Sequence, residues 1–295
     1  RQRQMCIRDS SKDAVSQYNF KEENIMVVQH NLSAMNTNRQ MGVVTSALQK
    51  STEKLSSGYK INRAGDDAAG LSISEKMRSQ IRGLNKASDN AQDGISLIQV
   101  AEGALNETHS ILQRMNELAT QAANDTNTSV DRQSIKDEIE QLNEELDRIS
   151  TTTQFNKQDL LTGGFSGKLQ VGALKGQTMD VKISLAVSAK GLNVSAVEVS
   201  TNVKAGAAMQ SIQDAIESVS KQRSKLGAIQ NRLEHTINNL DTNAENTQAA
   251  ESRIRDTDMA DEMVQYSKNN ILSQAGQSML AQANQQTQGV LSLLG

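Results

Sequence analysis

The feature that most limits how this chain can fold is a row of apolar residues spaced seven apart in its C-terminal third. The row consists of Ile212, Val219, Leu226, Leu233 and Leu240, and none of the 295 residues is a proline. A seven-residue apolar spacing predicts a helix that packs along a partner helix, and without proline nothing forces that helix to break. At ~1.5 Å per residue, a helix over residues 212–254 would be about 65 Å long, which favours a rod over a globule.

The composition supports a narrow helical core. Aromatic residues make up 2% of the chain, and tryptophan is absent. A core without large rings has to be built from Leu, Ile, Val, Met and Ala, which suit a seam between helices. The net charge is -3 without a basic block, which argues against a nucleic-acid partner. No run reaches the ~18 apolar residues of a membrane helix, so we expect no membrane insertion.

Helical spacing recurs along most of the chain. Gly58 is expected to end the first helix, and residues 65–67 to form a turn and a helix cap. Residues 256–258 are expected to start the last helix. The predicted helices cover approximately residues 32–55, 89–124, 130–150, 205–254 and 259–295.

Between the third predicted helix and the long helix after it, apolar residues recur at every second position. Met179, Val181 and Ile183 alternate with polar residues, and several glycines nearby mark turns. We therefore expect a β-hairpin module over residues 163–200, with a last strand over residues 192–199. The chain is predicted to be mainly α, elongated, and to have apolar helical ends that need other chains to cover them.

The first 25 residues look foreign to this fold. They contain the only cysteine, Cys6, and lack both an apolar period and the features of a secretory signal peptide. An amphipathic pattern begins directly after Met26. We interpret Met26 as the native start and residues 1–25 as a non-native, artefactual leader. The alternative is a genuine disordered extension. One thiol excludes an internal disulfide.

No pattern indicates a catalytic, cofactor or metal site. His30, His109 and His235 lie far apart in the sequence, and residues 234–236 do not begin an HExxH zinc motif. No GK[ST] follows the glycines at 163–164, so they form no phosphate loop. We predict no enzymatic activity, no cofactor and no metal.

Ordered blocks of sequence resemble bacterial flagellins. The resemblance covers nearly all of residues 26–295, including both ends of that range. Its blocks are KLSSGYKINRAGDDAAGLSISEKMRSQIRGL (54–84), NAQDGISLIQVAEGALNE (90–107), SKLGAIQNRLEHTINNL (224–240), AESRIRDTDMADEM (250–263) and QANQQTQGVLSLL (282–294).

This resemblance implies an elongated antiparallel coiled-coil bundle in which the N- and C-terminal helices pair. An inner domain would consist of residues 26–68 plus 252–295. An outer helical rod would consist of residues 69–251, with the β-hairpin module at 163–200. So short a middle is similar to that of a minimal flagellin without large variable outer domains.

The resemblance also implies a function. The chain would polymerise with itself into the extracellular flagellar filament for motility. It would leave the cell through the flagellar secretion apparatus without a cleaved signal peptide. Its partners would include an export chaperone, the filament cap and the hook-junction proteins.

The apolar terminal helices are the expected assembly surface, because sister subunits would bury what a single chain leaves exposed. Burial of one such side chain contributes roughly 1.5–3 kcal/mol. The residues expected to contribute are Leu48, Leu55, Ile271, Met279, Leu280, Leu291 and Leu294.

A second role follows from the resemblance alone. Flagellin-sensing Toll-like receptors of a host would bind the stretches LQRMNELATQ (112–121) and SIKDEIEQL (134–142). Arg114, Leu118 and Glu138 fall on the family's contact positions. The structural reading of the same residues is that Arg114 is a solvated charge and Leu118 belongs to the core.

Two other functions remain open at this point. A hook–filament junction protein shares the N-terminal pattern, but the C-terminal blocks favour flagellin. An enzyme or adhesin carried on a flagellin rod would need more room than the short middle offers.

Overall fold

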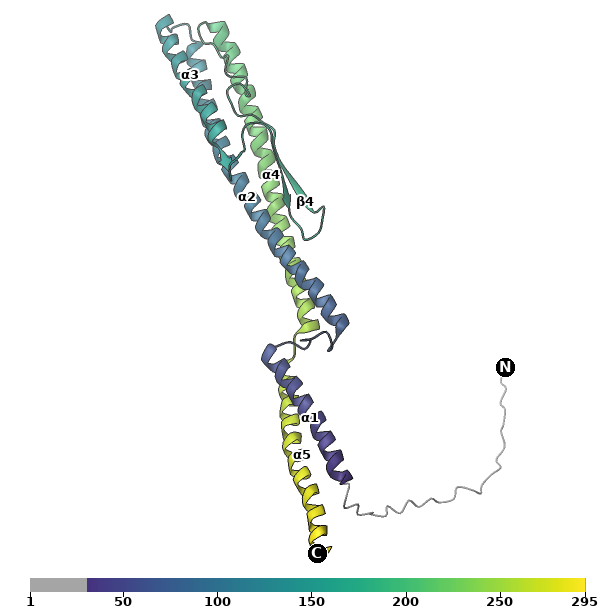
Figure 1. The fold of residues 1–295 in the computed structure, drawn as a ribbon. Helices are drawn as coiled ribbons and strands as arrows, with labels where there is room; N and C mark the ends of the chain where they lie inside the picture. The colour runs from purple at the N-terminus through teal and green to yellow at the C-terminus, as the bar shows by residue number, and fades with distance from the viewer. Residues whose placement is uncertain (1–30, 295) are drawn as a thin grey trace, which may run out of the picture. The chain divides into compact units, whose positions relative to one another are not determined.

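The computed structural model describes residues 31–294, apart from the side chains of residues 287 and 290–294. Residues 1–25, Met26 and His30 therefore lie outside the described residues. The described chain divides into two compact units. We call residues 59–256 the rod unit, and residues 31–58 with 257–294 the terminal unit. Each has its own helices (Figure 1).

Three helices form the rod unit: α2 (Ala68–Ala122), α3 (Ser129–Thr152) and α4 (Asn202–Arg255). With 55 and 54 residues, α2 and α4 are each about 80 Å long at ~1.5 Å per residue. They run antiparallel, since Ser88 Oγ donates to Asp241 Oδ1 over 3.0 Å near one end and Asn202 Nδ2 donates to the Ala123 carbonyl at the other. The rod is thus an elongated antiparallel bundle.

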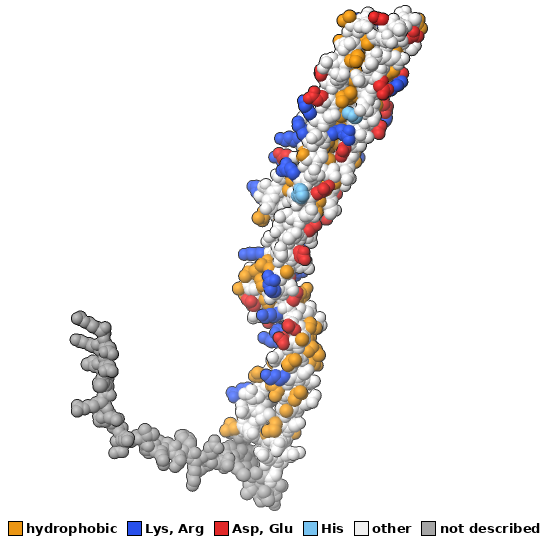
Figure 2. Space-filling model, turned by 180° about the vertical axis from the view of Figure 1, so that it is seen from behind, with side chains coloured by type: hydrophobic (Ala, Val, Ile, Leu, Met, Phe, Trp, Pro, Cys, Tyr) orange, Lys and Arg blue, Asp and Glu red, His pale blue; other side chains and the backbone are white. Residues whose placement is uncertain are grey.

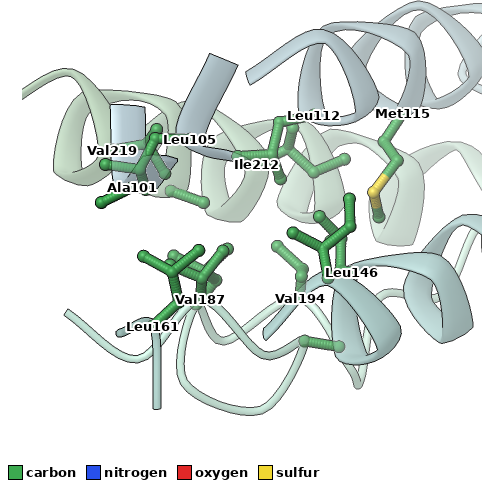
Figure 3. Packing of buried hydrophobic residues seen from close by; sticks show 14 of the residues in the cluster. Ala101, Leu105, Leu112, Met115, Leu146, Leu161, Val187, Val194, Ile212 and Val219 are labelled. Atoms are coloured by element: carbon green, nitrogen blue, oxygen red, sulfur yellow. The ribbon is translucent and has the colours of Figure 1, made fainter. Parts of the chain in front are cut away.

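The seven-residue rows form the core of this bundle. All five residues of the row that begins at Ile212 are buried on α4. Ile98, Leu105 and Leu112 oppose them from α2 and are fully buried. Figure 3 shows this core closed by Leu146 of α3 and by Val187 and Val194 of the connecting segment. The expected helix–helix seam is confirmed.

The helix α2 begins 21 residues earlier than the predicted start at residue 89. The helix begins at Ala68, where the Asp67 side chain caps it by accepting from Gly70 N over 2.9 Å. The expected cap at residues 65–67 is thereby confirmed. The buried positions that follow include Gly70, Ser74 and Ser88. These small and polar residues hid the helical period from a search for apolar residues.

Two antiparallel strand pairs lie between α3 and α4. The strands β1 (Gln154–Phe155) and β2 (Gln158–Asp159) form a short pair, and β3 (Phe165–Gln170) and β4 (Thr178–Ile183) form the expected hairpin. Alternate residues of β4 are buried, as predicted.

The predicted strand over residues 192–199 is wrong. Residues 189–197 form turns, in which the backbone N–H groups of Val194 and Ser195 both donate to the Ala189 carbonyl. Asn193 takes a left-handed φ of 58°, which breaks an extended strand. The apolar residues Leu192, Val194 and Val199 are nevertheless buried, which explains why this stretch is rich in apolar residues.

The terminal unit consists of α1 (Leu32–Ser57) and α5 (Met259–Leu294). These helices pair antiparallel: Asn31 Nδ2 donates to the Ala283 carbonyl over 2.9 Å, and Lys54 Nζ lies 3.4 Å from Glu262 Oε2. Gly58 ends α1 with a φ of 74°. The expected pairing of the N- and C-terminal helices is confirmed.

One end of the rod unit is closed by Arg255. Its guanidinium lies 4.7 Å from the centre of the Tyr59 ring and 3.4 Å from Glu75 Oε1. The Arg255 carbonyl accepts from Lys60 N over 2.7 Å. Because these contacts tie residues 59–60 to the end of α4, the division of the chain falls at residues 58 and 257.

Among the described residues, none of the helices combines the length and the apolar character that a membrane span requires.

Two glycines of α2 test how closely the hairpin packs on this helix. A Cβ at Gly103 would meet nothing within 4 Å, so Gly103→Ala should raise the free energy of unfolding by about 0.5–1 kcal/mol. A Cβ at Gly83 would lie 2.8 Å from Ala173 Cβ and 3.3 Å from its Cα. Gly83→Ala should therefore be less stable than Gly103→Ala by about 1–3 kcal/mol. Urea unfolding followed by circular dichroism measures both, and equal gains would contradict the close packing.

Candidate assembly surface

The two helices of the terminal unit meet along one regular seam. On each helix the seam consists of positions of reduced exposure that alternate spacings of three and four, as in a coiled coil. On α1 they are Ala34, Thr37, Met41, Val44, Leu48, Ser51 and Leu55; on α5 they are Glu262, Tyr266, Asn269, Ser273, Gly276, Leu280 and Ala283.

Small and polar residues interrupt this seam, above all on α5. Among the described side chains of the terminal unit, only Ser51 and Ala283 are buried. A Cβ at Gly276 would lie 3.8 Å from Met41 Cγ, an ordinary van der Waals distance, so Gly276 leaves unfilled space at the seam. Small and polar residues bury little apolar area, so the seam contributes much less hydrophobic stabilisation than the core of the rod unit.

Several large apolar side chains of α5 face away from the seam. Val264, Ile271, Ala275 and Met279 follow each other at spacings of seven, four and four, which places them on one face of the helix. Val264, Ile271 and Met279 are each more than half exposed. We call these four residues, with the exposed Leu272 beside them, the α5 stripe. Hydrophobic side chains are spread along the surface of the terminal unit (Figure 2).

The α1 helix adds exposed apolar side chains of its own. Leu32, Met35 and Val43 are each more than 60% exposed and lie off the seam. The paired helices therefore present apolar surface on more than one side. Exposed apolar surface of this kind is a candidate for a protein–protein contact.

The expected assembly residues divide into two groups. Leu48, Leu55 and Leu280 lie in the seam and are half-buried, whereas Ile271 and Met279 lie on the α5 stripe. The side chains of Leu291 and Leu294 lie outside the described side chains.

Val264 and Leu272 were missed by the sequence prediction. Val264 stands seven residues before Ile271, so continuing that row towards the N-terminus would have found it.

The predicted receptor residues lie on the rod unit. Arg114 of α2 reaches Glu138 of α3, with Nε donating to Oε1 over 3.0 Å, and its Nη1 lies 3.2 Å from Glu117 Oε2. The hydrogen bonds that Arg114 donates to these carboxylates, above all the one to Glu138, raise the pKa of Arg114. Leu118 is 2% exposed and belongs to the core beneath. The structure thus brings Arg114 and Glu138 together on the surface but not Leu118.

The two described histidines lie on separate helices of the rod unit, His109 on α2 and His235 on α4. In the described part of the chain, no group of three or more His, Cys, Asp or Glu side chains could hold a metal ion.

Comparison with known proteins identifies the family. Residues 28–166 match the bacterial flagellin N-terminal helical region, and residues 209–294 match the bacterial flagellin C-terminal helical region. The two matches contain α1, α2, α3 and α5 and most of α4.

Individual relatives agree with the family match. A flagellin of Halalkalibacterium halodurans is 56% identical over 271 residues, which covers 91% of this chain and 100% of that protein. A flagellin of Bacillus subtilis is 51% identical over 304 residues, with the same coverage. A solved structure of a putative flagellar hook-associated protein from Vibrio parahaemolyticus covers 65% of this chain and 100% of its own, with a TM-score of 0.57. At 16% identity it shows a shared fold only.

These matches span both terminal helical regions at high identity to flagellins, which decides between the functions left open by the sequence. The chain belongs to the bacterial flagellin family and is a structural protein of the bacterial flagellum rather than an enzyme.

Proposed function

We propose that this chain polymerises into the extracellular flagellar filament for motility, and that the terminal unit forms the inner contacts between subunits. The observation that carries the proposal is the α5 stripe, whose apolar side chains face away from the only helix that packs on α5 among the described residues. A sister subunit is the partner that a homopolymer supplies for such a surface.

The energetics favour polymerisation. Burial of one Val, Ile or Met side chain contributes roughly 1.5–3 kcal/mol, so three or four residues of the stripe offset a large part of the entropy lost on association. Contacts between unlike faces of identical subunits extend into a helical filament wherever the rotation between subunits does not close a ring. In this arrangement the terminal unit forms the inner domain and the rod unit the outer one.

The route to the filament is part of the proposal. The chain would leave the cell through the flagellar secretion apparatus without a cleaved signal peptide. An export chaperone would cover the apolar C-terminal segment beforehand, and the filament cap and hook-junction proteins would contact the chain during growth. The weak seam of the terminal unit supports this route, since α1 and α5 newly expose little buried area when they separate.

Polar substitutions on the α5 stripe should stop filament growth. In the Val264→Ser/Ile271→Ser variant the subunits lose apolar contact area, so the critical concentration for elongation on filament seeds should rise at least about a hundredfold. Light scattering or sedimentation measures the elongation. Removal of residues 256–295 gives the elongation that remains without α5.

The matched control is Val203→Ser on α4. Val203 is 82% exposed but belongs to the rod unit, away from the stripe, so this variant should elongate normally. Unchanged elongation of the Val264/Ile271 variant would show that the α5 stripe is not the contact.

A second proposed role is recognition by a flagellin-sensing Toll-like receptor of a host. It is supported by the Arg114–Glu138 pair, in which both side chains are about half exposed on neighbouring helices. Leu118 would act indirectly, by holding α2 against the core below the pair. Asn116 stands where strongly stimulating flagellins commonly carry Arg, which predicts weak signalling.

Loss of the Arg114 side chain should weaken receptor binding. We expect Arg114→Ala to reduce the affinity of the purified subunit for the receptor ectodomain about tenfold, because the guanidinium would pair with the receptor's acidic groups. Surface plasmon resonance is the measurement. Arg148→Ala is the control, since Arg148 forms a similar exposed pair with Glu145 on α3. Equal binding by both variants would remove this site.

A further inference from the structure

The methionines of this chain are distributed unequally between the two units. In the terminal unit, Met35, Met259, Met263 and Met279 are between 49% and 65% exposed. In the rod unit, Met115 is fully buried and Met179 is 9% exposed. The remaining described methionines, Met41, Met77 and Met209, are partly buried. Every methionine exposed to about half or more in the described residues thus lies in the terminal unit.

We propose that these four thioethers are oxidation sites, and that their oxidation by a peroxide or a hypohalous acid prevents a free subunit from joining a filament. This inference rests on the proposed function, because it requires that the terminal unit supplies subunit contacts. The oxidant reacts directly with the thioether, and the product is methionine sulfoxide.

The oxidation of a methionine needs no reagent besides the oxidant itself. With hydrogen peroxide, a lone pair of the methionine sulfur attacks one peroxide oxygen. The S–O bond forms, the O–O bond breaks, and the leaving hydroxide takes the proton of the transferred oxygen to become water. The sulfur loses two electrons and the peroxide gains them. The rate follows the exposure of the sulfur, so the four exposed side chains react before Met115 and Met179.

The position of each site connects the modification to assembly. Met279 belongs to the α5 stripe, between Ala275 and the C-terminal end of α5. Met259 and Met263 are one turn apart at the start of α5, and Met35 lies on the exposed side of α1. A sulfoxide is polar and strongly hydrated, so covering it against a neighbouring subunit is unfavourable unless it gains a donor there.

The same arrangement makes the modification selective for the free subunit. The core of the rod unit holds no exposed methionine among the described residues, so oxidation leaves its fold intact. In a filament the terminal unit would be covered, and its thioethers would be shielded. An oxidant would therefore stop growth without dismantling filaments already formed.

The test compares subunits before and after treatment with hydrogen peroxide. Peptide mapping by mass spectrometry should find oxidation at Met35, Met259, Met263 and Met279 before Met115 or Met179. The oxidised full chain should elongate filament seeds with a critical concentration raised at least about tenfold. Treatment with methionine sulfoxide reductases should restore elongation. In assembled filaments the same four residues should react more slowly than in free subunits.

A variant separates these sites from all others. Met35→Leu/Met259→Leu/Met263→Leu/Met279→Leu keeps the apolar character and retains Met5 and Met26, so it should elongate both before and after peroxide. Equal inhibition of this variant by peroxide would overturn the proposal, as would unchanged elongation of the oxidised natural sequence. If the variant does not elongate untreated, failure of the reductases to rescue the oxidised natural sequence overturns it instead. The Val264→Ser/Ile271→Ser variant, measured without oxidant, reports separately on the proposed function.

Discussion

The packing of α2 against α4 is the interaction on which the rest of the rod unit depends. Ile98, Leu105 and Leu112 on one helix face Ile212, Val219 and Leu226 on the other, and all six are fully buried. Long helices with so few aromatic residues have no other large source of stabilisation, because each contributes only a narrow apolar row. The remaining elements then cover this seam: α3 through Leu146, and the connecting segment through Val187 and Val194.

The terminal unit uses the same spacing with a different composition. Its seam has the alternation of three and four that a coiled coil requires, but Ser51, Ser273 and Gly276 stand where the rod unit has Leu, Ile and Val. Geometry alone therefore does not determine how stable a helix pair is; the side chains at the seam do. The Lys54–Glu262 ion pair adds register more than stability, since partly exposed pairs contribute at most about 1 kcal/mol.

Seven-residue rows made most of the helices predictable, and the hairpin was predictable from the alternation at Met179, Val181 and Ile183. The start of α2 was not, because Gly70, Ser74 and Ser88 are buried without being apolar. The strand over residues 192–199 was predicted wrongly, because turns can bury apolar residues as a strand does. For the assembly surface, the sequence pattern predicted apolar residues of both terminal helices. It could not tell that Leu280 lies in the seam and Ile271 on the opposite face, since that division depends on how the two helices are rotated against each other.

The rotation of α5 determines which of its apolar side chains the terminal unit exposes. If α5 turned the Val264, Ile271 and Met279 side chains towards α1, the pair would bury them within one chain and would need no neighbour. The observed rotation places Ser273 and Gly276 at the seam and leaves Val264, Ile271 and Met279 outside. Under the proposed function, the hydrophobic stabilisation missing from one subunit is gained only between subunits. Completion of the terminal fold and growth of the filament then become a single step. The same outward placement exposes four thioethers to solvent, so sensitivity of the free subunit to oxidants follows from the surface that drives assembly.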